Sequence, residues 1–287
     1  MKQIPWRRMD WVNLSVIAAV HLLALAGVFW MIFHFSWWTL GLGLVWGAAC
    51  GLSITGGYHR LFAHPTYRAS WPLRLFYLLF GAASVQNSAL KWASDHRRHH
   101  ASTDQAADPY NIQKGFWWAH VGWVLVREDV AGFDNAQDLQ ADPLIRFQHR
   151  FYVLLALAMG FLLPMLLAEA WGDAVGGLLV AGFLRLFLQY HATFSVNSVA
   201  HCLGGQPYSR ATSARDSFLT ALITLGEGYH NFHHRFPTDY RNGVRFYHFD
   251  PTKWWVWCWA RLKVIRDVRR TSPQAIAEAR EAVRQAA

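Results

Sequence analysis

Histidines crowd into three short segments of this 287-residue chain. Two of them share the spacing H-x-x-H-H, from His96 to His100 and from His230 to His234, and the third, from His59 to His64, is an H-x-x-x-x-H pair. Residues three and four apart lie on one helical face, so each H-x-x-H-H segment can aim imidazoles at a common point. Neutral imidazole is the commonest protein ligand of zinc, copper, iron and nickel, whereas calcium and magnesium prefer oxygen. The spacing therefore predicts a transition-metal site.

The apolar residues, 53% of the chain, are concentrated in long segments. Residues 13–35 and 37–55 carry no Asp, Glu, Lys or Arg, and as helices they can cross a hydrocarbon core of about 30 Å. Residues 151–168 and 174–200 form a second pair of long apolar segments, the latter with one arginine, Arg185. Trp and Tyr lie near several ends, as in an aromatic belt. We expect an all-α integral membrane protein with four transmembrane helices in two hairpins.

Positive charge lies on one side of the predicted spans. The basic residues that precede the first and third spans are Lys2, Arg7, Arg8, Arg146 and Arg150. The turns inside the two hairpins, 35–38 and 169–173, contain no lysine or arginine. By the positive-inside rule, both termini and all the histidine segments face the cytoplasm, where the formal net charge of +9 meets anionic membrane lipid. Nucleic-acid binding is not expected, because the arginines flank spans and histidines and form no separate basic module.

Residues 71–90 are apolar but are expected to lie in the membrane interface. If this segment crossed the bilayer, the histidines before and after it would face opposite sides and could not share a site. A cytoplasmic helical cap, residues 56–150 and 201–270, would then carry the histidine-rich di-metal site, followed by a tail at 271–287. We expect a single membrane domain over residues 1–287.

The cysteines and the first residues add two expectations. Cys50, Cys202 and Cys258 are widely separated and form no C-x-x-C motif, so neither disulfides nor a thiolate cluster is expected. Residues 1–10 lack the apolar core of a cleavable signal peptide, and the first apolar segment is long enough to remain in the membrane.

The order of these segments resembles that of integral-membrane fatty acyl desaturases of the stearoyl-CoA (Δ9) type. The resemblance covers most of the chain and rests on three histidine segments in this order between two hairpins, with an added N-S-x-x-H segment. The matching stretches are His59–His64, Trp92 with Asp95–His100, Asp108-Pro109, His120–Trp123, Asn197–His201, Leu225–His234 with Phe236-Pro237, Asp239–Arg241 and Asp250–Trp254. It implies an O2-dependent enzyme that introduces a cis double bond, at Δ9, into a saturated acyl chain held as a thioester or lipid ester.

The resemblance further implies two iron ions and nine histidine ligands. One iron would be held by His59, His64, His96, His100 and His233. The other would be held by His99, His201, His230 and His234, with Asn197 reaching it through a water. Asn197 lies one helical turn before His201, so the two side chains face the same way. Zinc would be an artefactual substitute, since overexpressed iron sites are often filled by the wrong metal.

Removing hydrogen from an unactivated methylene requires an oxidant that no side chain supplies, so a cofactor must act. The carboxylates expected to orient the imidazoles through their other ring nitrogen are Asp95, Asp108, Glu227 and Asp239. The residues expected to contact the substrate head group are Asn87, Trp92 and Arg127. We expect a narrow, kinked acyl tunnel that runs from the cytoplasmic face down between the spans and is closed between the first and fourth.

Two positions depart from the family pattern. Ser94 stands where the acyl-CoA enzymes carry an arginine, and Arg127-Glu128 stands where they carry a basic pair; both positions are associated in the family with the CoA head group. CoA, acyl carrier protein and a membrane glycerolipid therefore all stay open as carriers. The chain has no heme-binding H-P-G-G module. A separate electron donor is expected, either of ferredoxin or rubredoxin type or of cytochrome b5 type with a reductase.

Two other functions stay open. The first is hydroxylation of an alkane, sterol or carotenoid by the same metal site, against which the N-S-x-x-H and L-G-E-G-Y-H-N-F-H-H segments favour the desaturase. The second, of a different class, is a non-redox membrane protein that binds or transports metal. Transporters place coordinating groups near mid-membrane, whereas these histidines lie at the predicted cytoplasmic ends of the spans.

Overall fold

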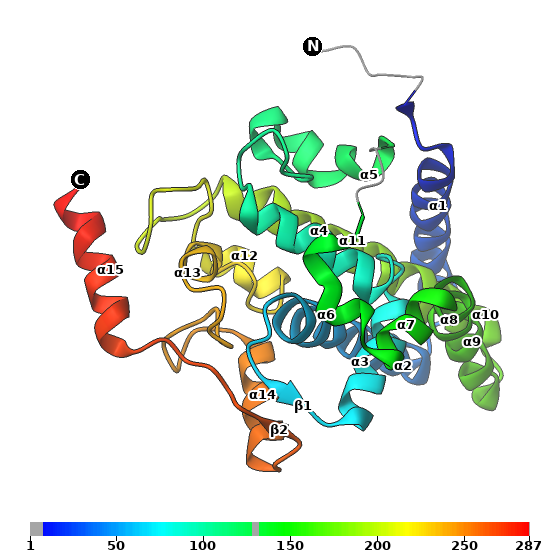
Figure 1. Cartoon of the computed structure of the whole chain (residues 1–287). Helices are drawn as coiled ribbons and strands as arrows, with labels where there is room; N and C mark the ends of the chain where they lie inside the picture. Colours follow the sequence, from blue (N-terminus) through cyan, green and yellow to red (C-terminus); the bar gives the residue numbers. More distant parts are fainter. Residues whose placement is uncertain (1–7, 128–131, 287) are drawn as a thin grey trace.

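A computed structural model describes residues 8–127 and 132–286, so Glu128 lies outside the described residues. Helices dominate the fold, and four of the helical stretches form two hairpins (Figure 1). In chain order the elements are α1 (Trp11–Phe33), α2 (Trp37–Leu52), η2 (Ser53–Ala63), β1 (Arg68–Ala69), α3 (Trp71–Ala83), α4 (Ala89–Ala101), η3 (Ile112–Lys114), η4 (Trp118–Gly122), α5 (Trp123–Leu125), η5 (Asp134–Ala136), α6 (Gln137–Gln140), α7 (Pro143–Arg150), α8 (Tyr152–Leu157), η6 (Ala158–Leu162), α9 (Leu163–Ala168), η7 (Glu169–Trp171), α10 (Ala174–Gly176), η8 (Gly177–Leu184), α11 (Arg185–Asn197), η9 (Val199–His201), α12 (Phe218–Ile223), α13 (His230–Arg235), α14 (Pro251–Arg261), β2 (Ile265–Arg266) and α15 (Pro273–Gln285).

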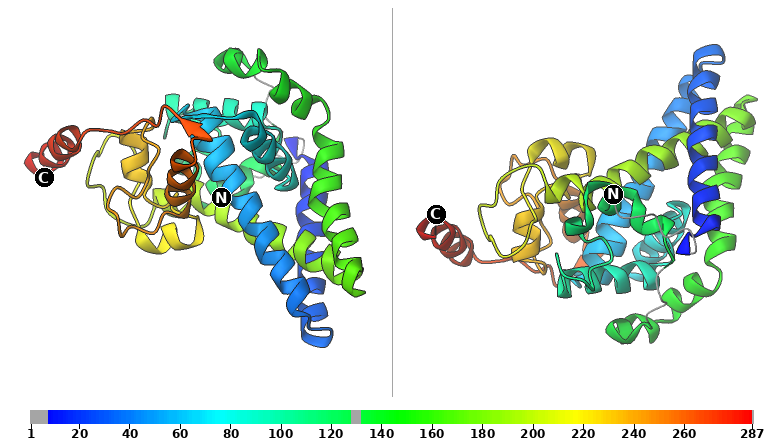
Figure 2. Two further views of the ribbon diagram at one scale, coloured as in Figure 1. Left: turned by 90° about the horizontal axis from the view of Figure 1, so that it is seen from below. Right: turned by 90° about the horizontal axis from the view of Figure 1, so that it is seen from above.

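Four continuous helical stretches are long and apolar enough to cross a membrane, which confirms the four predicted spans. They are Trp11–Phe33, Trp37–Ala63, Tyr152–Trp171 and Ala174–His201. The second stretch is longer than predicted because η2 continues α2 without a break as a π-helix. The two hairpins project together from the rest of the molecule, and the remaining helices gather beside their other ends (Figure 2).

Asp173 ties the two hairpins together at the ends remote from the three histidine segments. Its carboxylate caps α10 by accepting from the Gly176 backbone N–H at 3.0 Å. The same carboxylate accepts from Trp30 Nε1 of the first span at 3.0 Å and from the Thr39 hydroxyl of the second. The acidic turn expected between the third and fourth spans therefore also fixes the turn of the first hairpin.

Two glycines allow η2 and α3 to approach closely. A Cβ on Gly81 of α3 would lie 2.3 Å from the ring of Tyr58, and a Cβ on Gly57 of η2 would lie 2.6 Å from Tyr77. Both tyrosines are fully buried in the largest core cluster, most of whose residues belong to the cap. Each helix thus receives the tyrosine of the other, and this packing holds the first histidine segment against α3.

The helix expected over residues 71–90 is shorter and is followed by a second helix. α3 ends at Ala83, and Val85 and Asn87 then adopt positive φ angles of 50° and 72°, which a continuing helix does not permit. The chain re-enters a helix at Ala89, and this second helix, α4, carries the second histidine segment. The C-terminal part returns to the same region, since β2 pairs antiparallel with β1 through Arg68↔Arg266 and Ala69↔Ile265.

Candidate metal centre and acyl cavity

The structure gathers nine histidines into two groups. Within each group, one ring nitrogen per residue lies within 4.8 Å of all the others. The first group is His59, His64, His96, His100 and His233, and the second is His99, His201, His230 and His234. Eight of these residues come from the three histidine segments, and His201 comes from the end of the fourth span. This division is the one that the resemblance implies.

The H-x-x-H-H spacing allows each of two helices to serve both groups. In α4, His96 and His100 face the first group while His99 faces the second. In α13, His233 faces the first group, and the flanking histidines face the second. Two short helices thus hold the groups next to each other.

The first histidine segment reaches the site through π-helical geometry. The backbone N–H of His64 donates to the carbonyl of His59 at 3.1 Å, an i to i+5 hydrogen bond. This wider turn brings residues five apart onto one face, which an α-helix does not do. His64 also ends the helix, as expected from Pro65.

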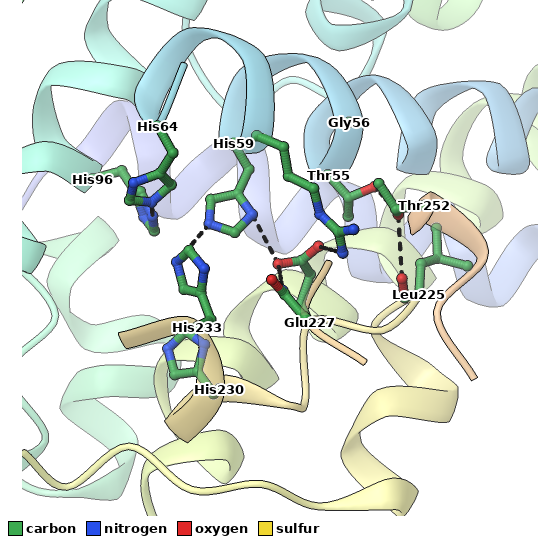
Figure 3. Close-up of polar contacts among 12 residues, drawn as sticks. Thr55, Gly56, His59, His64, His96, Leu225, Glu227, His230, His233 and Thr252 are labelled. Atoms are coloured by element: carbon green, nitrogen blue, oxygen red, sulfur yellow. Dashed lines mark hydrogen bonds and ion pairs between the residues drawn. The ribbon is translucent and has the colours of Figure 1, made fainter. Parts of the chain in front are cut away.

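Ring nitrogens face one another inside the groups. His233 Nε2 lies 3.0 Å from both His59 Nε2 and His100 Nε2, and His64 Nε2 lies 2.9 Å from His96 Nε2. Figure 3 shows His59 between His233 on one side and Glu227 on the other. These approaches point the imidazoles inward, as ligands of one ion would point.

Glu227 fixes the orientation of His59. Its Oε2 lies 2.8 Å from His59 Nδ1, and since a carboxylate only accepts, Nδ1 must carry a hydrogen; in the neutral ring, Nε2 then presents a lone pair. Arg60 Nη2 donates to Oε1 at 2.8 Å, and Asn242 Nδ2 donates to Oε2 at 2.6 Å. Burial would raise the pKa of Glu227, but the opposing effects of His59 and Arg60 lower it to about 2. Glu227 is therefore an anion at neutral pH.

The loop before Glu227 depends on a glycine. Gly226 adopts φ +99°, and a Cβ there would lie 2.7 Å from Oδ1 of Asp250. Asp250 accepts from Arg60 Nη2 at 3.0 Å and caps α14 by accepting from the Lys253 backbone N–H at 2.8 Å. This close approach explains why the segment reads Gly-Glu at this point.

Asp108 acts on His99 in the same way. Its Oδ1 lies 2.8 Å from His99 Nδ1, so His99 also turns a bare Nε2 toward its group. The carboxylate accepts from the backbone N–H groups of Asp104 and Tyr110, each at 3.0 Å. Burial opposes ionisation, yet the hydrogen bond from His99 and those from the two backbone N–H groups lower the pKa of Asp108 below its ordinary value.

The donor set fits a transition-metal ion. His201 Nε2 is buried and has no hydrogen-bond partner within residues 8–127 and 132–286. Burial, followed by the charges of neighbouring histidines, lowers the pKa of His64, His96, His100, His230, His233 and His234 well below the ordinary value. These imidazoles are neutral at pH 7, and neutral imidazole is the form that binds metal.

Among the described residues, neither Asp95 nor Asp239 has a hydrogen bond or ion pair to a histidine, contrary to the expectation from the sequence. Asp95 accepts from Lys91 Nζ at 2.7 Å and from Arg98 Nη1 at 3.0 Å. Asp239 accepts from Arg241 Nη2 and from the Thr271 backbone N–H, each at 2.8 Å. Both carboxylates are engaged by basic or backbone donors instead.

An apolar cavity of about 440 Å³ opens from the first histidine group into the hairpins. His59, His96 and Trp92 line it together with His230 of the second group, and the remaining wall comes mainly from the second and fourth spans, Leu40 to Thr55 and Val180 to Asn197. Gly43, Gly47 and Gly51 give one side of this wall. The cavity was expected to close between the first and fourth spans, but no residue of the first span lines it. The space lies instead against the second span, where these three glycines have no side chains to fill it.

Comparison with known proteins places the chain. The fatty acid desaturase family model matches residues 35–258. The chain belongs to the fatty acid desaturase family. It is 45% identical over 251 residues to a probable acyl-CoA desaturase of Schizosaccharomyces pombe, and the aligned region covers 86% of this chain and 52% of that protein. It is 41% identical over 291 residues to acyl-CoA desaturase 1 of Saccharomyces cerevisiae (96% and 56%), and 38% identical over 273 residues to stearoyl-CoA desaturase of Sus scrofa (93% and 76%). The chain thus spans about half the length of the two fungal relatives.

The residues expected to contact the head group lie in different places in this desaturase family member. Trp92 lines the cavity and stacks on His96, with ring centroids 4.9 Å apart. Asn87 and Arg127 are exposed and line no part of the cavity. Ser94 is buried and donates to Asn135 Oδ1 at 2.7 Å. Asn197 lines the cavity and lies at the end of α11, four residues before His201.

The desaturase fold also holds a buried arginine that the sequence reading missed. Arg185, in the fourth span, lines the cavity and is 5% exposed. Its guanidinium donates to the carbonyls of Ala181, Ala83 and Gly160 at 3.0, 2.9 and 3.0 Å. None of the ion pairs found in the described part of the chain includes it. Its position inside a predicted span was the signal that could have singled it out.

Proposed function

We propose that this protein is an O2-dependent acyl desaturase that introduces a cis double bond at Δ9 into a saturated fatty acyl chain at a di-iron site. The observation that carries the proposal is the direct opening of the first histidine group into the apolar cavity. His59 and His96 belong to both. The names of the relatives, acyl-CoA and stearoyl-CoA desaturases, support an acyl substrate.

The two irons would be held by the two histidine groups, with Asn197 reaching the second through a water. Bound iron supplies the electron chemistry by which dioxygen removes hydrogen from an unactivated methylene, which no side chain can do. The overall reaction takes two hydrogens from the chain and two electrons with two protons from outside, and it converts O2 into two waters. A separate electron donor and reductase are therefore part of the proposal.

The protein's own residues would bind the acyl chain, orient the histidine ligands and exclude water. The walls of the second and fourth spans would hold the saturated chain away from water, with Trp92 against the carbons nearest the histidines. Glu227 and Asp108 would keep His59 and His99 in the tautomer that presents Nε2. Such a shaped channel is needed because neighbouring methylenes are chemically equivalent and differ by only about 1–3 kcal/mol in an apolar pocket.

The carrier and the orientation belong to the proposal as well. Both termini and the histidine segments would face the cytoplasm, where an acyl thioester or lipid ester can present its head group. Of the three residues expected to contact the substrate, Arg127 and Asn87 lie outside the cavity wall. Only Trp92 lines the cavity, beside histidines that would hold the first iron.

The proposal is tested by expressing the chain in cells that lack their own desaturase and supplying saturated C16 and C18 fatty acids. We expect both products to carry a cis double bond nine carbons from the carboxyl end, because the head group sets the register of the chain in the tunnel. A double bond at a constant distance from the methyl end would replace this account by one that counts from the tail. A hydroxylated product without unsaturation would favour the hydroxylase instead.

A further inference from the structure

A hydroxyl and a carboxylate lie in a row behind His201. His201 Nδ1 is 2.7 Å from Ser213 Oγ, and Ser213 Oγ is 2.6 Å from Asp104 Oδ1. The backbone N–H of Ser213 also donates to Asp104 Oδ2, at 2.6 Å. His201 ends the fourth span, Asp104 follows α4, and Ser213 lies in the loop between η9 and α12. The row therefore joins three segments that are far apart in the sequence.

The hydrogens along this row have one consistent arrangement. An ionised carboxylate only accepts, so the single hydroxyl hydrogen of Ser213 points to Asp104. The Ser213 oxygen must then accept from His201, which places the imidazole hydrogen on Nδ1. His201 Nε2 is left with a lone pair, and this atom is the buried nitrogen without a hydrogen-bond partner in the described part of the chain.

We propose that Asp104 and Ser213 are positioning residues for the second metal ion, acting through His201. The inference rests on the proposed function, which makes His201 a ligand. Ser213 selects the tautomer and the ring orientation of His201, and Asp104 selects the orientation of the Ser213 hydroxyl. Ligating histidines generally depend on such an acceptor at the other ring nitrogen.

The same turn also orients a second histidine of the group. The backbone N–H of Asp104 donates to Asp108 Oδ2 at 3.0 Å, and Asp108 Oδ1 holds His99 Nδ1. Asp104 adopts φ +65°, a conformation that few residues other than glycine tolerate, although aspartate is among them. The spacing D-x-x-x-D after the second histidine segment thus sets two of the four imidazoles, one directly and one through a hydroxyl.

The test compares Ser213→Ala with Ser213→Thr and with Ser209→Ala. Ser209 lies in the same loop, and its hydroxyl accepts only a local bond from the Ala211 backbone N–H among the contacts found for it. The full-length protein is freed of metal with a chelator and titrated with Co2+, whose absorption reports each binding step, and the melting temperature of the metal-free form is recorded.

We expect the Ser213→Ala variant to bind one Co2+ like the wild type and the other about 10- to 100-fold more weakly. Ser213→Thr keeps the hydroxyl and should restore most of the affinity, and Ser209→Ala should match the wild type. Asp104→Asn should weaken the same binding step, and it should add little in the Ser213→Ala background because both changes act on one row.

Equal affinity of both steps in Ser213→Ala and in the wild type would overturn the inference. If Ser213→Ala does not fold, the Asp104→Asn variant decides: unchanged affinity for both ions overturns the inference, and weakening of one step supports it. A wild-type protein that binds no Co2+ at either group would instead overturn the proposed metal site itself, so the two failures are distinguishable.

Discussion

Arg60 and Glu227 form a buried ion pair, with Nη2 and Oε1 2.8 Å apart and both side chains almost fully enclosed. Arg60 follows His59 in the sequence, and Glu227 holds His59 Nδ1 through its other oxygen. The negative charge of Glu227, which orients His59, is thus balanced by Arg60, the next residue along the same helix. Because Asp250 also pairs with Arg60, the pair connects the histidine to the cap of α14.

Glu227→Gln should weaken both the fold and the metal site. Removal of one partner of a buried ion pair costs about 3–5 kcal/mol. The loss of the anionic acceptor at His59 should also lower metal affinity at the first group by about 10- to 100-fold. Chemical denaturation and metal titration measure the two effects. Asp138→Asn, which breaks an ion pair whose acid is 54% exposed, is the matched control and should cost only about 0–1 kcal/mol. Equal effects of the two changes would contradict the role of Glu227.

Cysteine labelling tests whether α3 stays on one side of the membrane. The exposed Cys202 and Cys258 are first replaced by serine. Cysteines at Arg68, before α3, and at Ala101, the last residue of α4, should then be labelled by an impermeant reagent from the same, cytoplasmic, side. A cysteine at Trp37, the first residue of α2 beside the turn of the first hairpin, should be labelled from the opposite side. Labelling of the first two positions from opposite sides would contradict the topology on which the shared site depends.

Arg185→Met should destabilise the protein. The change leaves the carbonyls of Ala83 and Gly160 without their donor, and each unsatisfied buried group costs about 1–3 kcal/mol. Arg185→Lys should recover little, because a lysine ammonium does not reproduce the planar fork of donors. Thermal unfolding in lipid nanodiscs is the measurement, with the exposed Arg146→Met as control. A melting temperature equal to that of the wild type would show that other donors replace the guanidinium.

The metal-free protein should lose stability in mild acid. The pKa values of His64, His96 and His100 lie well below 6.5 in the fold, and those of the three α13 histidines are lowered in the same way. The unfolded chain binds protons at these groups below about pH 6.5 while the folded chain does not, so stability falls as the pH falls. Unfolding free energy should therefore drop between pH 7.5 and 5.5. No change over that range would contradict the neutral, enclosed imidazoles.

Helical periodicity explains which parts of the site were predictable. His96 with His100, and His230 with His234, share a helical face because they are four residues apart, so their convergence followed from spacing. The pairing of His59 with His64 depends on a π-helix, which the sequence pattern does not predict.

Contacts between distant segments were the part that spacing could not supply. Asp95 directly precedes His96, and Asp239 follows the third histidine segment, but each carboxylate forms an ion pair with a nearby arginine, Arg98 and Arg241 respectively. Asp104 reaches Ser213 across 109 positions of the chain, and no local pattern predicts such a pair. The expected position of the cavity, closed between the first and fourth spans, was wrong for the same reason. The spans that surround an open space are determined by how their side chains pack in three dimensions.

A single-turnover experiment tests the central claim most directly. The protein is purified with iron, its metal content is measured, it is reduced without oxygen in the presence of a saturated C18 acyl substrate, and O2 is then admitted. The account predicts one double bond per two irons in the wild type, no product in His99→Ala or His233→Ala, and wild-type yield in His34→Ala, where the histidine lies outside both groups. Unsaturated product from His99→Ala or His233→Ala, or a yield that does not depend on bound iron, would contradict it.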